Sequence, residues 1–182
     1  MDESPEWRSE GGAVPRVVVG VSESLGSLSA LQRAAAEARL RRLELCAVLA
    51  WQAPGGERGS RGYSGVSALA LCQSAAKERL REVLDTAFDA KNLGVTLSGY
   101  TVRGTAGAAL VDAAPDPDDL LVVGAGAQGP VRRLLRPSVA RYVLAHAACP
   151  VLTVPPSPLQ AVYEAAHRRN SWHLPLDLSE LA

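Results

Sequence analysis

Residues 16–51, RVVVGVSESLGSLSALQRAAAEARLRRLELCAVLAW, decide the fold of this chain. The run at 16–21 is rich in β-branched residues and does not alternate between apolar and polar positions, which is typical of a strand buried on both faces. Residues 22–42 then place apolar side chains three or four positions apart, behind serines suited to cap a helix. A second apolar run follows at 43–51. The segment therefore predicts a strand, a helix and a second strand.

The same alternation continues to residue 155. We expect further helices at 66–91, 104–114 and 138–147, the second of them capped by Thr105, and further strands at 95–103, 119–125 and 149–155. The strand at 95–103 alternates apolar and polar residues, as a strand at a sheet edge does. Five strands separated by four helices predict an α/β fold with a doubly wound, parallel, Rossmann-like sheet.

The chain of 182 residues suits one domain of ordinary size. We expect a flexible N-terminal segment at 1–14, the α/β domain at 15–155 and a C-terminal extension at 156–182. The extension has one stretch of helical periodicity and then apolar residues without it. It either packs on the domain or mediates a contact, and the sequence leaves both alternatives open.

Composition excludes several classes of protein. Lys and Arg total 19, as do Asp and Glu, so the basic excess of a general nucleic-acid binder is missing. No apolar run approaches the ~18 residues of a transmembrane helix, and the N-terminus lacks the regions of a signal peptide. Cys46, Cys72 and Cys149 lack the spacing of zinc ligands and are interpreted as small buried hydrophobes. These features predict a cytoplasmic protein without membrane or nucleic-acid partners.

A ligand site is expected where the winding of the sheet reverses. Ligands of doubly wound sheets bind beyond the carboxyl ends of the strands at that point. If the first and fourth strands are neighbours, the crevice lies between Gly20, Val21 and Ser22 and the loop that begins at Gly124. The glycines of that loop fit the letters of a dinucleotide-binding motif, but they follow the fourth strand rather than the first, so the motif fails.

Four stretches together resemble the universal stress protein family: residues 16–38, VLAW at 48–51, VRGTAGAAL at 102–110, and 119–155 with its ending ACPVLTVP. The resemblance covers about residues 15–155. It implies a five-stranded sheet of order 3-2-1-4-5 and a homodimer formed through the last strand, here residues 150–154. It also implies that ATP is a possible ligand, since some members bind it and others do not.

The resemblance also implies positions for a nucleotide site. ATP-binding members carry G-x2-G-x9-G-[ST] after the fourth strand, and a member of that kind has an aspartate after the first strand. On this chain the motif falls on Gly124, Ala127, Pro137 and Ser138, and the aspartate position is Ser22. The candidate nucleotide-binding residues are Gly20, Val21, Ser22, Ala50, Gly124, Gly126, Ala127, Gly129, Ser138 and Val139.

These departures weaken a phosphate site for physical reasons. Alanine at 127 disfavours a positive φ, and proline at 137 has no N–H to donate. Ser22 lacks the carboxylate that an aspartate would bring. Against these losses, Gly126 and Gly129 could shift the turn by one residue, and guanidinium groups could replace lost donors. The arginines in question are Arg132, Arg133, Arg136 and Arg141.

Two functions from different classes follow. The first is a stress-response regulatory or scaffold protein that acts as a dimer, has a degenerate nucleotide pocket and no catalytic activity, and binds no cofactor firmly. The second is a functional ATP- or adenine-nucleotide-binding protein, with slow hydrolysis as its extreme form. The dimer has support from the residues as well, because the uncharged sequence PVLTVP would form an unprotected sheet edge.

Overall fold

The computed structural model describes residues 14–22, 24–53, 66–88, 93–125 and 138–155. The chain forms five strands and four helices in these ranges, in the order β1 (Arg16–Gly20), α1 (Leu25–Arg41), β2 (Glu44–Trp51), α3 (Val66–Ala87), β3 (Leu97–Arg103), α4 (Ala106–Ala113), β4 (Leu120–Gly124), α6 (Val139–His146) and β5 (Val151–Val154). The expected terminal segments fall almost wholly outside the described residues, so the division of the chain at 15 and 155 stays a prediction.

The strands form one all-parallel sheet of order β3-β2-β1-β4-β5, which confirms the predicted fold class and strand order. The winding reverses between β1 and β4. Val17, Val18 and Val19 of β1 pair there with Leu120, Leu121 and Val122 of β4. β3 lies at one edge, as its alternating sequence predicts, and β5 lies at the other.

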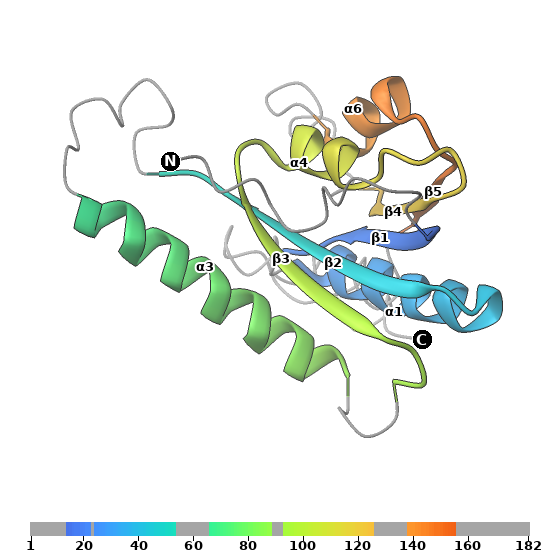
Figure 1. Ribbon diagram of the computed structural model, residues 1–182, viewed down its shortest axis with the longest axis horizontal. Coiled ribbons are helices and arrows are strands. Elements are labelled where there is room, and N and C mark those ends of the chain that lie inside the picture. The colour runs from blue at the N-terminus through green and yellow to red at the C-terminus, as the bar shows by residue number, and fades with distance from the viewer. Residues whose placement is uncertain (1–13, 23, 54–65, 89–92, 126–137, 156–182) are drawn as a thin grey trace, which may run out of the picture.

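The sheet is covered on both faces, which explains the unbroken apolar runs of its central strands. α1 and α3 lie on one face, and α4 and α6 lie on the other (Figure 1). Val17 and Val19 belong to the core under α1 and α3, whereas Val18 belongs to the core under α4 and α6. Alanines dominate the buried side of α1, so the helix can approach the sheet closely.

Local signals explain where α1 begins and ends. Ser24 is its N-cap, and the Ser24 hydroxyl accepts a hydrogen bond from the N–H of Ser27. At the other end Arg42 adopts a left-handed conformation with φ 58°, and the N–H of Leu43 donates to the carbonyl oxygen of Ala38. This pattern of hydrogen bonds is that of a Schellman motif, which usually has glycine at the left-handed position.

Two helix ends differ from the expectation in part. Thr105 is the N-cap of α4, as predicted, and its backbone is extended as at other caps, but its side chain makes no capping hydrogen bond. α3 ends at Ala87 rather than continuing toward residue 91. The N–H of Phe88 still donates to the carbonyl oxygen of Leu84, but Phe88 itself is no longer helical.

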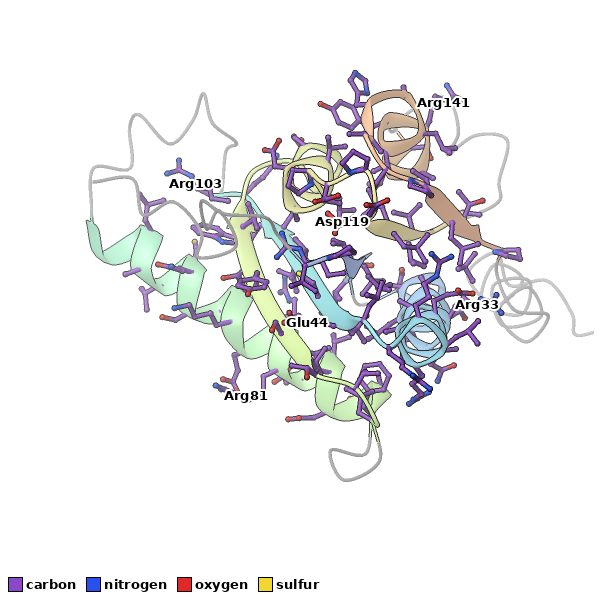
Figure 2. The ribbon with its side chains drawn as sticks, turned by 45° about the vertical axis from the view of Figure 1, so that its right-hand side comes forward. Arg33, Glu44, Arg81, Arg103, Asp119 and Arg141 are labelled. Atoms are coloured by element: carbon purple, nitrogen blue, oxygen red, sulfur yellow. The ribbon has the colours of Figure 1, made fainter. Side chains whose placement is uncertain are left out.

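Asp119 is a buried structural residue that directly precedes β4. One carboxylate oxygen accepts the N–H of Arg16 at 2.9 Å, and the other accepts the N–H of Asp116 at 3.2 Å. The Arg16 guanidinium in turn donates to the carbonyl oxygen of Ala113 at 3.0 Å. These bonds hold the amino ends of β1 and β4 together, opposite the edge where a ligand would bind (Figure 2).

Cys46 and Cys149 are buried, as expected, while Cys72 is half-buried on α3. Burial raises the pKa of the Cys46 thiol to about 12 and also raises the pKa of Cys149. Among the helices that the structure describes, none has the length and apolar character needed to cross a membrane.

Candidate functional site

The carboxyl ends of β1 and β4 lie side by side, as the sequence analysis required of a ligand site. The pairing of Val19 with Val122 continues the two strands so that Val21 ends level with Gly124. β2 flanks β1 on its other side, and Gly20 pairs with Val48. Ala50 therefore lies at the same carboxyl end of the sheet, in register with Val102 of β3.

Three serines at the start of α1 are bonded to one another and to the end of β1. The Ser27 hydroxyl accepts the N–H of Ser22 at 2.7 Å and donates to the carbonyl oxygen of Gly20 at 3.3 Å. The hydroxyls of Ser22 and Ser24 lie 3.0 Å apart, and the Ser24 hydroxyl accepts the N–H of Ser27 at 3.2 Å. We call Ser22, Ser24 and Ser27 the serine network. It satisfies the N–H of Ser22 within the chain.

The two glycines at the carboxyl ends of β1 and β4 are closely packed. A Cβ on Gly124 would lie 2.9 Å from the carbonyl oxygen of Gly26, in the first turn of α1. A Cβ on Gly20 would lie 2.8 Å from a terminal methyl group of Leu110 on α4. The Gly124 contact is with backbone, which cannot move aside without shifting the helix. Close packing thus accounts for Gly124 without any nucleotide.

The remaining described candidates lie at the start of α6 and along β1. Ser138 is the N-cap of α6, and its hydroxyl accepts the N–H of Arg141 at 3.4 Å. Val139 follows and is 37% exposed. Val21 is buried, and its N–H donates to the carbonyl oxygen of Val48 at 2.8 Å. Val21 therefore extends the β1–β2 pairing, while Ser22 and Ser138 are exposed.

The structure brings five candidates together where the central strands have their carboxyl ends: Gly20, Val21, Ser22, Ala50 and Gly124. The candidates Gly126, Ala127 and Gly129, and Pro137 of the motif, lie outside the described residues, as do Arg132, Arg133 and Arg136. Whether these candidates contact a ligand stays a prediction. Sequence reasoning missed the roles of Gly26 and Ser27. The role of Gly26 depends on how α1 crosses the end of β4, and that of Ser27 on how the chain turns from β1 into α1.

The electrostatics at the carboxyl ends of the strands suit an anion better than a metal ion. None of the four described helices carries an acidic residue in its first turn, where the positive end of the helix dipole lies. Arg103 ends β3 at this edge. Within the described ranges, no three His, Cys, Asp or Glu side chains come together in a way that could hold a metal ion. A phosphate or carboxylate group would therefore meet no negatively charged side chain in those first turns.

Comparisons with known proteins agree with this geometry. The family model described as "Universal stress protein family" matches residues 14–155. A solved structure of a universal stress protein in complex with cAMP is 30% identical, covers 80% of this chain and 100% of its own, and superimposes with a TM-score of 0.56. No curated protein sequence matches significantly.

Two further solved structures share the fold. A universal stress protein from Archaeoglobus fulgidus in complex with dAMP is 26% identical, with 77% of this chain and 97% of that chain covered and a TM-score of 0.53. Universal stress protein UspA from Lactobacillus plantarum is 21% identical, with 79% and 99% covered and a TM-score of 0.60. The similarity thus spans the α/β region and nearly the whole length of each of these proteins.

Proposed function

The chain belongs to the universal stress protein family, and we propose that it is a regulatory or scaffold protein of the stress response that acts as a dimer. Its site at the ends of β1 and β4 binds adenine nucleotides weakly or not at all. The protein acts in the cytoplasm, through partner binding rather than through catalysis.

The serine network is the observation that carries this proposal. A carboxylate at position 22 could accept hydrogen bonds from a ribose or hold a metal ion, but a serine hydroxyl brings no charge. The Ser22 hydroxyl lies 3.0 Å from that of Ser24, and its N–H already donates to Ser27. A ligand at this position would therefore compete with hydrogen bonds that the chain makes to itself.

The expected loss of affinity is large. A donor or charge contact that is missing from a site lowers binding by about 1–3 kcal/mol. Ser22, Ala127 and Pro137 are three such losses when the family's ATP motif is placed on this chain. Since about 1.4 kcal/mol corresponds to a tenfold change in affinity, their sum is enough to turn micromolar binding into millimolar binding.

A functional adenine-nucleotide site is the second candidate, and two observations favour it. The protein that is 30% identical was solved in complex with cAMP, and the similarity covers 80% of this chain. The first turns of all four described helices lack acidic residues, which leaves the positive helix ends available to a phosphate. Arginine contacts would then compensate for the glycine conformation lost at 127 and the N–H donor lost at 137.

The dimer is proposed to form through β5. The carbonyl oxygens of Pro150 and Val154 accept hydrogen bonds from β4. Because the groups of successive residues in a strand point to opposite sides, the N–H and C=O groups of Val151 and Thr153 point away from β4. Antiparallel pairing of β5 with the same strand of a second copy would satisfy them through an isologous contact.

The repair of the site tests its proposed decay. We expect the variant Ser22→Asp, Ala127→Gly, Pro137→Gly to bind ATP at least about tenfold more tightly than the wild type in isothermal titration. Ser74→Asp, at an exposed position on α3, adds the same charge elsewhere and should leave binding unchanged. A triple variant that folds and binds no better than the wild type would contradict this account of the loss.

A further inference from the structure

The second half of α1 presents a short apolar stripe to solvent. Ala36 and Leu40 are both exposed, Leu40 to 79%, whereas Ala38 on the side toward the sheet is fully buried. Residues four apart lie on the same face of a helix, so Ala36 and Leu40 are neighbours on the outside of α1. Burial of such a stripe is favourable, and it can therefore contribute to the binding of another segment.

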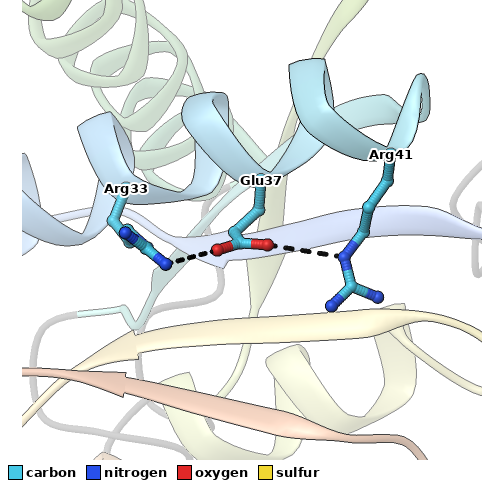
Figure 3. Close-up of polar contacts among 3 residues, drawn as sticks. All are labelled: Arg33, Glu37 and Arg41. Carbon is cyan, nitrogen blue, oxygen red and sulfur yellow. Dashed lines mark hydrogen bonds and ion pairs between the residues drawn. The ribbon is translucent and has the colours of Figure 1, made fainter.

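Arginines flank the stripe on both sides. Figure 3 shows Arg33 and Arg41 bracketing Glu37, with nitrogen–oxygen distances of 2.6 Å and 3.4 Å. Two guanidinium groups share one carboxylate there, so this flank keeps a positive charge. On the other flank Arg39 donates to the carbonyl oxygen of Leu93 at 2.6 Å, and no carboxylate of the described residues pairs with it. We call the surface of Arg33, Ala36, Arg39, Leu40 and Arg41 the basic face of α1.

The chain itself contains a segment of matching chemistry. Residues 1–13, MDESPEWRSEGGA, lie outside the described residues, and their sequence has four acidic side chains, one arginine and one tryptophan, Trp7. Carboxylates form charge-assisted hydrogen bonds with guanidinium groups, and the indole ring is the aromatic group that attracts cations best. An aromatic ring among acidic residues thus complements an apolar stripe among arginines. The acidic residues are Asp2, Glu3, Glu6 and Glu10.

This acidic segment joins the fold near the basic face. α1 ends at Arg41 and leads directly into β2 (Figure 1), whose first residue, Glu44, pairs with Arg16 at the start of β1. Val14 precedes Arg16 by two residues, so it lies at the same end of the sheet as the last turn of α1. Residues 1–13 can span roughly 40 Å when extended, whereas the 17 residues of α1 rise only about 25 Å. The segment can therefore reach the whole basic face.

We propose that residues 1–13 dock on the basic face of α1 in the same chain, with Trp7 against Ala36 and Leu40 and the acidic side chains on the flanking arginines. Exposed ion pairs are individually weak. Because the segment is tethered, its effective concentration at the face lies in the millimolar range, where weak contacts suffice. The docking is reversible, weakens with salt, and covers the basic face against any other acidic segment.

Paramagnetic broadening of amide signals in NMR spectra of the full chain tests this docking. Cys72→Ser removes the half-buried cysteine, and Ser4→Cys then carries a nitroxide label on the acidic segment. At low salt the label should broaden the signals of residues 36–41 at least about threefold more than those of residues 77–82 on α3. Salt at about 1 M, where charges are screened beyond about 3 Å, should remove most of this difference.

Two substitutions on exposed leucines make the test specific. Leu40→Glu places an acidic side chain in the centre of the basic face and should reduce the broadening of residues 36–41 at least about threefold. Leu71→Glu is the matched control, because Leu71 is 68% exposed on α3, and it should leave the broadening unchanged. The double variant Glu3→Gln, Glu6→Gln removes charge from the segment instead, and it serves if Leu40→Glu fails to fold.

Three results would overturn the proposal. The first is a wild type in which the label does not broaden the signals of residues 36–41 at low salt. The second is broadening that persists in Leu40→Glu and in the double glutamine variant, or that is lost in Leu71→Glu. The third comes from mixing nitroxide-labelled chains with isotope-labelled chains that carry no nitroxide. Docking within one chain predicts no broadening in this mixture, and strong broadening would place the segment on a second copy.

Discussion

Gly124 and Gly26 touch where the end of β4 meets the first turn of α1. A Cβ on Gly124 would lie 2.9 Å from the Gly26 carbonyl oxygen, closer than side chains approach backbone in folded proteins. The glycine that begins the family's nucleotide motif is therefore also a packing requirement. A chain that loses nucleotide binding would still have to keep it.

This contact predicts different costs for two glycine substitutions. Gly124→Ala should lower the free energy of unfolding by about 1–3 kcal/mol, because either the helix or the strand must shift. Gly20→Ala should cost less, since its Cβ meets a methyl group at the end of the flexible Leu110 side chain. Urea unfolding of both variants compares them, and equal costs would contradict the assignment of Gly124 to backbone packing.

The left-handed residue at the end of α1 offers a stabilising change. Arg42→Gly should raise the free energy of unfolding by about 1 kcal/mol, because glycine adopts φ 58° without the strain of a Cβ. Ala36→Gly, at an exposed position inside the same helix, should lower it by about the same amount. Thermal unfolding of the two variants should thus shift in opposite directions, and a loss of stability in Arg42→Gly would argue against the strained cap.

The buried carboxylate at the amino ends of the strands should matter for stability and not for ligand binding. Asp119→Asn keeps the shape but replaces one acceptor oxygen with a donor, which leaves the N–H of Arg16 or Asp116 unpaired, at a cost of about 1–3 kcal/mol. Asp118→Asn, at an exposed neighbour, should cost little. Denaturant unfolding tests the pair, and equal stabilities would show that the buried hydrogen bonds contribute nothing.

The cysteines should differ in reactivity. Burial raises the pKa of Cys46 to about 12, so in the folded protein it remains a thiol at pH 9, where an exposed cysteine is substantially ionised. Alkylation at pH 9 followed by mass spectrometry should modify Cys72 first, and Cys46 only after unfolding. Fast labelling of Cys46 in the folded state would refute this.

The raised pKa of Cys46 also predicts a pH dependence of stability. Because the unfolded chain releases the Cys46 proton at lower pH than the folded chain, the free energy of unfolding should fall between about pH 9 and 12, and it should fall less in Cys46→Ala.

The sequence was sufficient to predict the elements and their order. The apolar runs of β1, β2 and β4 are unbroken because helices cover both faces of the sheet, and the period of three to four residues in α1 reflects its one buried side. The strand order came from the resemblance, and it placed Ser22 and Gly124 at one edge. Such features are local or repeated, which is why they can be recognised without coordinates.

The contacts between distant segments could not be predicted in this way. No local pattern shows that the Asp119 carboxylate accepts a hydrogen bond from Arg16, because Arg16 lies 103 residues earlier in the chain. Ser27 appeared to be one of several capping serines, although its hydroxyl joins Ser22 to Gly20. Nor does any sequence pattern show that Gly26 lies against Gly124. The Arg16–Asp119 and Gly26–Gly124 contacts depend on which strands become neighbours and on how closely α1 approaches them. The Ser27 contacts depend on how the chain turns from β1 into α1.

Isothermal titration of the wild-type protein with ATP, ADP and cAMP tests the central claim most directly. If the site has lost its charge contact at Ser22, the glycine conformation at 127 and the N–H donor at 137, each nucleotide should bind with a millimolar dissociation constant or give no measurable heat. The purified protein should likewise carry no nucleotide. A micromolar dissociation constant for any of the three would contradict the account and establish the second candidate, a working adenine-nucleotide site.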